Sequence, residues 1–162
     1  TRYRKNLKKL RLFICFGVSF LIAAVGGSLT ILDSWYYSLV QPSWKPPDFL
    51  FGPIWTTIFS LLAISAYLCW TKYGLVLEAR RVLLIFFLNG LLNILWSYLY
   101  FFCQRPDWSL FEVVFLWLSI LLLISRTQKL SNVASVLLTP YLAWVSLASL
   151  LNYQTVMLNG PF

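Results

Sequence analysis

The sequence predicts an all-α integral membrane protein, a bundle of five transmembrane helices formed by a single domain over residues 1–162. Hydrophobic residues make up 60% of the chain and charged residues only 11%, and the mean hydropathy is +0.76. A water-soluble domain needs a largely charged surface, which 13 Lys and Arg with 5 Asp and Glu cannot supply. The apolar residues form long runs without the alternation of a transmembrane β-barrel, so helices are the expected spans.

The first two spans are predicted at residues 12–32 and 53–70, and neither contains a charge. The first is long enough to cross about 30 Å of hydrocarbon at about 1.5 Å per residue. A cleavable signal peptide has a shorter apolar core of about 7 to 15 residues, so we expect this run to stay in the membrane. In the second span, Pro53 suits the first helical turn, where its missing amide costs no hydrogen bond.

The remaining spans are predicted at residues 82–103, 108–125 and 133–158, and Glu112 is the only acid inside any of the five. Carboxylates within a membrane are often functional. Glu112, however, lies about one turn from the predicted helix start, which favours a capping role with access to water. Pro140 lies in the first half of the last span and is expected to bend it.

The distribution of Lys and Arg predicts a cytoplasmic N-terminus. In that orientation only Lys45 and Arg105 lie on the opposite side, which is a strong positive-inside pattern for a bacterial-type membrane. The basic residues then on the cytoplasmic side are Arg2, Arg4, Lys5, Lys8, Lys9, Arg11, Lys72, Arg80, Arg81, Arg126 and Lys129. We expect a multi-pass protein of the bacterial inner membrane, or of an organellar membrane if the source is eukaryotic.

The residue content disfavours several classes of function. The basic residues lie between apolar runs without a nucleic-acid motif, so we expect no nucleic-acid partner. Histidine is absent, which removes the commonest metal ligand and the usual general base. Cys15, Cys69 and Cys103 lack the close pairing of a metal site or disulfide framework and are predicted to be buried thiols. We therefore expect no metal site and no obligatory cofactor.

The connection over residues 33–52 is rich in proline and tryptophan, and we expect it to form a stiff lid. Proline fixes backbone angles, so little entropy is lost when the loop becomes ordered. Tryptophan favours the boundary between water and lipid. Trp35 and Trp44 are therefore equally compatible with a ligand contact and with an aromatic belt that anchors the loop.

Several strings of rare residues follow one another along the chain. The lid and the start of the second span carry Trp35-Tyr36-x-x-Leu39-x-x-Pro42-Ser43-Trp44-x-Pro46-Pro47 and then Gly52-Pro53-Ile54-Trp55-Thr56. Later spans carry Asn93-x-x-Trp96, Pro140-Tyr141-Leu142-Ala143-Trp144 and Leu151-Asn152-Tyr153. In order and spacing these strings resemble the TspO family, also called the translocator protein or peripheral benzodiazepine receptor family. The resemblance covers roughly residues 17–159.

The resemblance implies a five-helix bundle, usually dimeric, with a ligand cavity under the lid. It also implies that Tyr36, Trp55, Asn93 and Trp144 lie in that cavity, and that protoporphyrin, haem or a similar flat hydrophobic molecule is the ligand. Some bacterial members of the family degrade protoporphyrin in light. The animal cholesterol motif needs a basic residue shortly after its tyrosine, and this chain has none after Tyr153. Cholesterol recognition by that motif is therefore not supported.

Helical spacing independently indicates a cavity. Two sets of residues each share one helix face: Asn89, Asn93, Trp96 and Tyr100 in the third predicted span, and Pro140, Trp144, Ala148 and Asn152 in the fifth. Amides facing lipid would be unsatisfied, so each asparagine is expected to bind either a ligand or another helix. The small Ala148 leaves room beside Trp144 for a flat ring. Trp55, one turn into the second span, and Trp144 form the expected stacking pair, although the residues alone favour core packing for Trp144.

The expected function is a membrane receptor, sensor or carrier that binds a tetrapyrrole in a Trp-lined cavity. The predicted ligand-binding residues are Tyr36, Trp44, Trp55, Asn89, Asn93, Trp96, Pro140, Trp144 and Ala148. One alternative is an enzyme that degrades protoporphyrin in light, with Trp55 and Trp144 as the catalytic candidates, and another is a small exporter or scaffold. Membrane lipid and a second copy of the chain are the expected partners. The third span lacks the paired glycines that some family members carry, since Gly90 is its only glycine, which disfavours a dimer contact there. The first span offers Ala23, Ala24, Gly27 and Ser28 instead, small residues that permit close helix approach.

Overall fold

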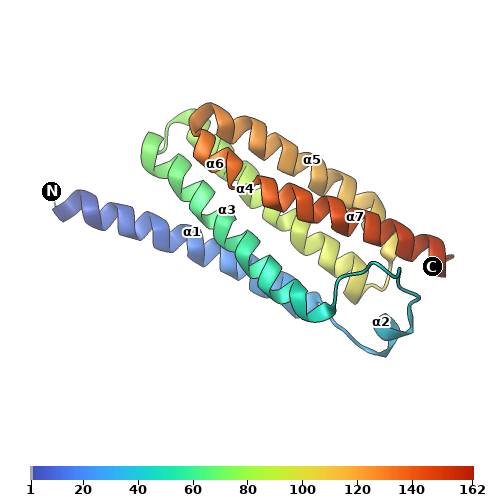
Figure 1. Cartoon of the computed structure of the whole chain (residues 1–162). Helices are drawn as coiled ribbons and strands as arrows, with labels where there is room; N and C mark the ends of the chain where they lie inside the picture. The colour runs from blue at the N-terminus through green and yellow to red at the C-terminus, as the bar shows by residue number, and fades with distance from the viewer. Residues whose placement is uncertain (1) are drawn as a thin grey trace.

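The computed structural model describes residues 2–162, and within them five long helices lie side by side, with the two ends of the chain at opposite ends of the bundle (Figure 1). The helices are α1 (Arg2–Leu29), α2 (Ser34–Ser38), α3 (Phe51–Tyr73), α4 (Leu77–Ser97), α5 (Pro106–Leu130), α6 (Asn132–Val136) and α7 (Thr139–Asn159). A 3-10 turn, η1 (Asp48–Leu50), precedes α3, and a π turn, η2 (Tyr98–Phe102), extends α4. Residues 2–162 contain no strand, which confirms the predicted fold class.

Five segments of this described region are long and apolar enough to cross a membrane. They are Arg2–Leu29, Asp48–Tyr73, Leu77–Phe102, Pro106–Leu130 and Asn132–Asn159. Each corresponds to one of the five predicted spans. The chain is therefore a multi-pass integral membrane protein, as its sequence predicts.

The first helix differs most from its prediction because it begins at Arg2 rather than near residue 12. Arg and Lys are good helix formers, so the helix continues through the basic segment beyond the apolar run. At about 1.5 Å per residue, its 28 residues reach about 42 Å, which exceeds the thickness of the hydrocarbon. It ends at Leu29, before the predicted residue 32, and Asp33 then accepts a hydrogen bond from the Tyr36 backbone N–H to cap α2.

Proline residues set the starts of two helices. Pro53 lies in the first turn of α3, as predicted. Pro140 was expected to bend a continuous helix, but the structure interrupts the helix at Leu137 and Leu138 and begins α7 at Thr139. Because Pro140 has no N–H to donate to the carbonyl of Val136 and its ring crowds that carbonyl, the helix restarts with the proline in its first turn.

The core of the bundle joins α3, α5 and α7, while α1 packs on α3 and α4. The buried members of this core are Ile58, Phe59, Leu62, Val113, Leu116, Ile120, Leu123, Leu138, Tyr141 and Val145. Many large apolar side chains instead point outward, among them Phe13 and Phe111, which are 78% and 72% exposed. Such a surface suits lipid rather than water.

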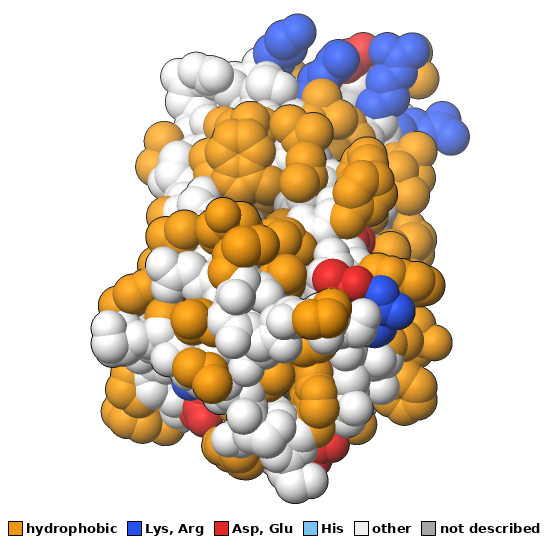
Figure 2. Space-filling view, turned by 90° about the vertical axis from the view of Figure 1, so that its right-hand side faces the viewer, with side chains coloured by type: hydrophobic (Ala, Val, Ile, Leu, Met, Phe, Trp, Pro, Cys, Tyr) orange, Lys and Arg blue, Asp and Glu red, His pale blue; other side chains and the backbone are white. Residues whose placement is uncertain are grey.

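Charge and apolar surface are separated along the bundle. Figure 2 shows Lys and Arg side chains gathered along the top edge of one face, with hydrophobic side chains over much of the rest. Lys45 and Arg105, near the other end of the spans, each pair with a nearby aspartate, Asp48 and Asp107. This distribution is the one from which the cytoplasmic N-terminus is predicted.

Candidate ligand-binding site

An aromatic cluster forms where the first two turns of α3 face the first two turns of α7. Trp55 and Trp144 meet edge to face, with ring centroids 6.4 Å apart and planes at 85°. Phe51 lies 5.4 Å from Trp144 at 71°, and Tyr141 lies 6.2 Å from Trp55 at 73°. These are the arrangements that aromatic quadrupoles favour. The structure thus brings together the two indoles that the sequence pairs.

An open groove of about 510 Å³ lies beside this cluster, between α3 and α7. Its lining residues are Pro53, Ile54, Thr57, Ile58, Pro140, Ala143, Trp144 and Leu147. Sites for small molecules commonly have volumes of about 300–1,000 Å³ and mostly apolar walls. Pro140, a predicted site residue, forms part of the wall because it begins the helix that carries Trp144.

The indole nitrogen of Trp144 is the unusual polar atom of this site. It is buried and has no hydrogen-bond acceptor within residues 2–162. A buried donor without an acceptor costs about 1–3 kcal/mol. A ligand with an oxygen or nitrogen acceptor at this position would remove that cost.

The lid is held over the cluster by a chain of contacts. The Tyr36 hydroxyl donates to Asp48 Oδ1 at 2.9 Å, and the Lys45 ammonium pairs with the same oxygen. Lys45 Nζ also lies 5.8 Å from the Tyr36 ring centroid and 5.5 Å from that of Phe51. Burial and, secondarily, the hydrogen bond to Asp48 raise the pKa of the Tyr36 phenol above its usual range. Tyr36 is therefore joined to the site through Lys45 and Phe51.

Trp44 has a different place in the lid. Its indole N–H donates to Gln154 Oε1 at 2.8 Å, near the end of α7. Close by, Asn159 exchanges two hydrogen bonds with the backbone of Val40, at 2.7 and 2.9 Å. These three bonds attach the lid to the C-terminal part of α7, and Trp44 contributes to this attachment.

The polar face of α4 bonds to α5 and α7. Asn89 donates to Ser119 at 2.7 Å and accepts from the Tyr141 hydroxyl at 3.0 Å, while Asn93 donates to Tyr141 at 3.2 Å. Trp96 donates to Asn152 at 3.3 Å. The sequence predicts either ligand contact or interhelical hydrogen bonds for these asparagines, and the structure shows the interhelical hydrogen bonds. Asn89 and Asn93 reach the aromatic cluster only through Tyr141, which touches Trp55.

Two remaining predictions concern Ala148 and Glu112. Ala148 is half-buried one turn beyond Trp144, as its spacing predicts. The capping role predicted for Glu112 is wrong, because its side chain is buried, 5% exposed, and neither carboxylate oxygen has a partner among the described residues. The helix begins at Pro106 rather than 108, so Glu112 lies in the second turn and faces inward. Asp107 is the acid of the first turn, and it pairs with Arg105.

Sequence reasoning missed three members of the site. Phe51 and Tyr141 complete the aromatic cluster, and Asp48 joins Tyr36 to Lys45. Phe51 lies four residues before Trp55 and Tyr141 lies three before Trp144, so each shares a helix face with the indole that follows. That spacing was the available signal.

The fold and this groove define a class, a five-span membrane protein with an aromatic cluster that the lid contacts through Lys45 and Phe51. Residues 13–158 match the family model described as the TspO/MBR family, and the chain belongs to that family.

Individual relatives support the same assignment. The chain is 38% identical over 160 residues to tryptophan-rich protein TspO of Chlorobaculum tepidum, which covers 95% of this chain and 99% of that protein. It is 30% identical over 153 residues to protein CrtK of Rhodobacter capsulatus, covering 93% and 94% of the two chains. The human translocator protein is 32% identical over 120 residues, covering 74% of this chain and 71% of its own.

Proposed function

We propose that this protein is a membrane receptor, sensor or carrier that binds a tetrapyrrole, such as protoporphyrin or haem, or a similar flat hydrophobic molecule. The observation that carries the proposal is the edge-to-face pair of Trp55 and Trp144 beside an apolar groove of about 510 Å³. A macrocycle seated there would stack on an indole and remain in contact with apolar walls.

Two further features support this ligand class. The buried N–H of Trp144 offers one directional hydrogen bond to a ring or carboxylate acceptor. The groove is open on one side, so a hydrophobic molecule dissolved in the bilayer can enter between α3 and α7 without crossing water. The residues that line the groove include no thiol or imidazole, so binding through stacking rather than through a metal ion is expected.

A second candidate is light-dependent degradation of bound protoporphyrin. The same geometry favours it, because the Trp144 indole lines the groove and the oxidisable Trp55 indole lies directly behind it, with ring centroids 6.4 Å apart. In this account Trp55 and Trp144 are the electron donors nearest to the excited porphyrin. An exporter or scaffold would need neither indole.

We propose that the protein is a homodimer that associates through α1. Ala24 and Ser28 are exposed and lie one turn apart, and Gly27 beside them has open space where a Cβ would point. Gly90 is different, since a Cβ there would come within 2.5 Å of Ile22 in the same chain. Gly90 is thus occupied by packing between α4 and α1, which leaves the small residues of α1 for a partner.

The test is a titration of the purified protein with protoporphyrin, followed by Trp fluorescence in darkness and then under illumination. Saturable quenching in darkness that is reversed on removing the porphyrin supports a receptor or carrier. Loss of porphyrin absorbance under illumination, faster than for free porphyrin and dependent on Trp55, supports the enzyme. Quenching that never saturates would leave only the exporter or scaffold.

A further inference from the structure

We propose a second binding site, for an anionic phospholipid, at the N-terminal end of the bundle. Its headgroup phosphate would lie in a basic pocket between α1 and α3, and an acyl chain would lie in the apolar groove below, between α1, α3 and α4. This site is separate from the Trp55 and Trp144 groove and does not depend on its ligand.

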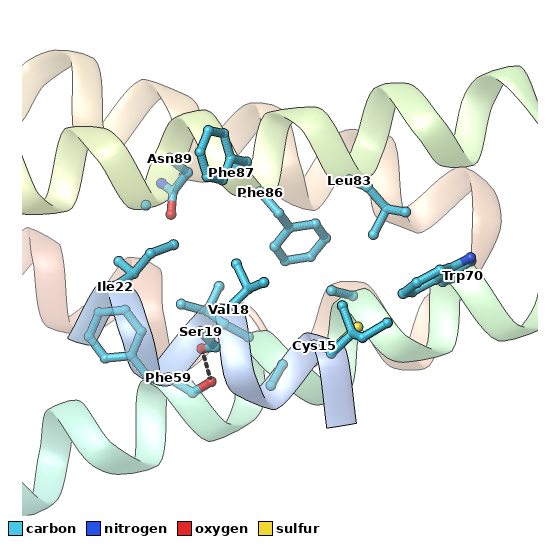
Figure 3. Close-up of a pocket in the computed structure, with 15 residues that line it drawn as sticks. Cys15, Val18, Ser19, Ile22, Phe59, Trp70, Leu83, Phe86, Phe87 and Asn89 are labelled. Atoms are coloured by element: carbon cyan, nitrogen blue, oxygen red, sulfur yellow. Dashed lines mark hydrogen bonds between the residues drawn. The ribbon is translucent and has the colours of Figure 1, made fainter. Parts of the chain in front are cut away.

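The apolar groove has a volume of about 240 Å³ and is formed by three helices (Figure 3). Cys15 and Val18 of α1, Phe59 of α3 and Leu83 and Phe86 of α4 are among the side chains that surround it. In the middle of the bundle the wall of the groove is formed by Ile22, which packs directly on Gly90. The groove suits a narrow apolar chain that enters from the N-terminal end.

Apart from the Trp70 indole at the N-terminal end, the hydrogen-bonding side chains of this groove already have partners within the protein. Ser19 donates to the carbonyl of Phe59 at 2.6 Å, the bond drawn in Figure 3, and Asn89 donates to Ser119 at 2.7 Å. The occupant of this part therefore needs no polar group. A hydrocarbon chain meets that requirement, since an unpaired polar group would be costly there.

A basic pocket of about 480 Å³ adjoins the groove at its N-terminal end. Its lining residues are Arg4, Lys5, Leu7, Lys8, Arg11 and Thr71. The two spaces meet at consecutive residues, because Thr71 lines the pocket and Trp70 lines the groove. Arg11 holds this junction, with its guanidinium 5.4 Å from the Trp70 ring centroid and its NH1 donating to the Trp70 carbonyl at 3.1 Å.

Two donors at the junction lack acceptors in the part of the chain that the structure describes. These are the indole N–H of Trp70 and the hydroxyl of Thr71, both buried. Two other threonines of α3, Thr56 and Thr57, donate their hydroxyls to the backbone carbonyls four residues earlier. Thr71 makes no such bond. A phosphate oxygen at the junction would accept from both donors, as charge-assisted hydrogen bonds.

The charges of the chain favour a lipid over a second copy as the occupant. A protein partner for this pocket would need accessible acids, and the chain has five. Asp48 and Asp107 are paired with basic residues, Glu78 is paired with Arg81, and Glu112 is buried. Asp33 lies in the lid region, at the other end of α1, where it caps α2. Basic pockets beside transmembrane helices are characteristic sites for anionic lipid headgroups.

The experiment measures retention of lipid by the full-length protein in native mass spectrometry. Phosphatidylglycerol and phosphatidylcholine with the same acyl chains are compared, and inorganic phosphate is added in a separate arm. We expect phosphatidylglycerol to be retained about fivefold or more over phosphatidylcholine, and phosphate alone not to displace it. Equal retention of the two lipids would overturn the proposal, and complete displacement by phosphate would assign the pocket to a free anion.

Variants separate this site from general surface charge. Lys8→Gln should lower the preference severalfold, while the matched control Lys129→Gln, which removes a basic residue at the same end of the bundle outside the pocket, should leave it unchanged. Thr71→Val keeps both shape and net charge and should also weaken retention. Val18→Phe should narrow the groove and weaken retention of both lipids. If Lys129→Gln acts as strongly as Lys8→Gln, or if Thr71→Val and Val18→Phe both retain lipid normally, the proposal is wrong.

Discussion

Replacing the two clustered indoles is the sharpest perturbation of the proposed ligand site. Trp144→Ala removes edge-to-face contacts with Phe51 and Trp55. Trp55→Ala removes edge-to-face contacts with Tyr141 and Trp144 and a tilted contact with Phe59. At about 0.5–1.5 kcal/mol for each aromatic pair, the second variant should be the less stable protein. Trp144→Ala also removes the indole that lines the groove, and Trp55→Ala removes the ring that packs against that indole. We expect a loss of about 1–3 kcal/mol in binding, roughly tenfold or more in affinity.

Trp144→Phe distinguishes the contribution of the aromatic ring to binding from that of the indole N–H. It keeps an aromatic surface but deletes the buried N–H that lacks an acceptor in the described chain. If the ligand accepts from this N–H, the phenylalanine variant should bind several times more weakly while the free protein becomes no less stable. If the N–H has no role in binding, affinity should stay near that of the parent protein.

The assay is equilibrium titration with protoporphyrin, after helical content and oligomeric state have been checked in detergent. Trp117→Ala is the matched control, since this indole lies on α5 and donates to Ser146 at 2.8 Å outside the cluster. Ala148→Leu should weaken binding by a different route, because it adds volume near Trp144 instead of removing a contact. It should reduce the affinity for large porphyrins most and leave the fold intact. Unchanged porphyrin affinity in both Trp55→Ala and Trp144→Ala would refute the reasoning and return the two indoles to a packing role.

Three further predictions concern orientation, metal coordination and the buried acid. With the N-terminus in the cytoplasm, an impermeant thiol reagent applied to intact cells should label Ser43→Cys in the lid and not Lys72→Cys; the reverse pattern would show the opposite orientation. Metal-free protoporphyrin should bind about as well as haem, and the idea fails if haem binds about a hundredfold tighter with a thiolate spectrum that Cys103→Ala abolishes. Glu112→Gln should unfold thermally at the same or a higher temperature than the parent, because an amide of the same size cannot ionise in this buried position, where the carboxyl has no partner among the described residues. A capping role would instead require a loss of about 0.3–1 kcal/mol.

The number and approximate places of the helices could be predicted from the sequence because membrane-spanning segments must be long, apolar and internally hydrogen-bonded. The helix ends could not, since apolar runs mark the membrane rather than the helix. The basic residues from Arg2 continue α1 into water, and Pro140 begins a helix instead of bending one. The predicted role of Glu112 failed for the same reason, because the true start of α5 at Pro106 moves this residue into the second turn.

The candidate site was predictable where spacing along one helix decides the outcome. Trp55, one turn into the second predicted span, was paired with Trp144, which shares a face of the fifth predicted span with the small Ala148, and the structure brings the two indoles together. What spacing could not supply is which helices are neighbours. The sequence is therefore compatible with either a ligand contact or an interhelical contact for Asn89 and Asn93, and in the structure both asparagines bond to the Tyr141 hydroxyl of α7. The groove below Arg11 is formed by three helices together, so the pattern of residues within any one of them does not predict it.

Photo-crosslinking tests the central claim most directly. A protoporphyrin that carries a diazirine group is bound in darkness in a membrane of uncharged lipid, activated, and located on the chain by peptide mass spectrometry. The account predicts labels on residues 51–58 of α3 and 140–147 of α7, which surround the groove beside Trp55 and Trp144. Labels confined to the α1 and α4 walls of the other groove, around Val18 and Phe86, would contradict it.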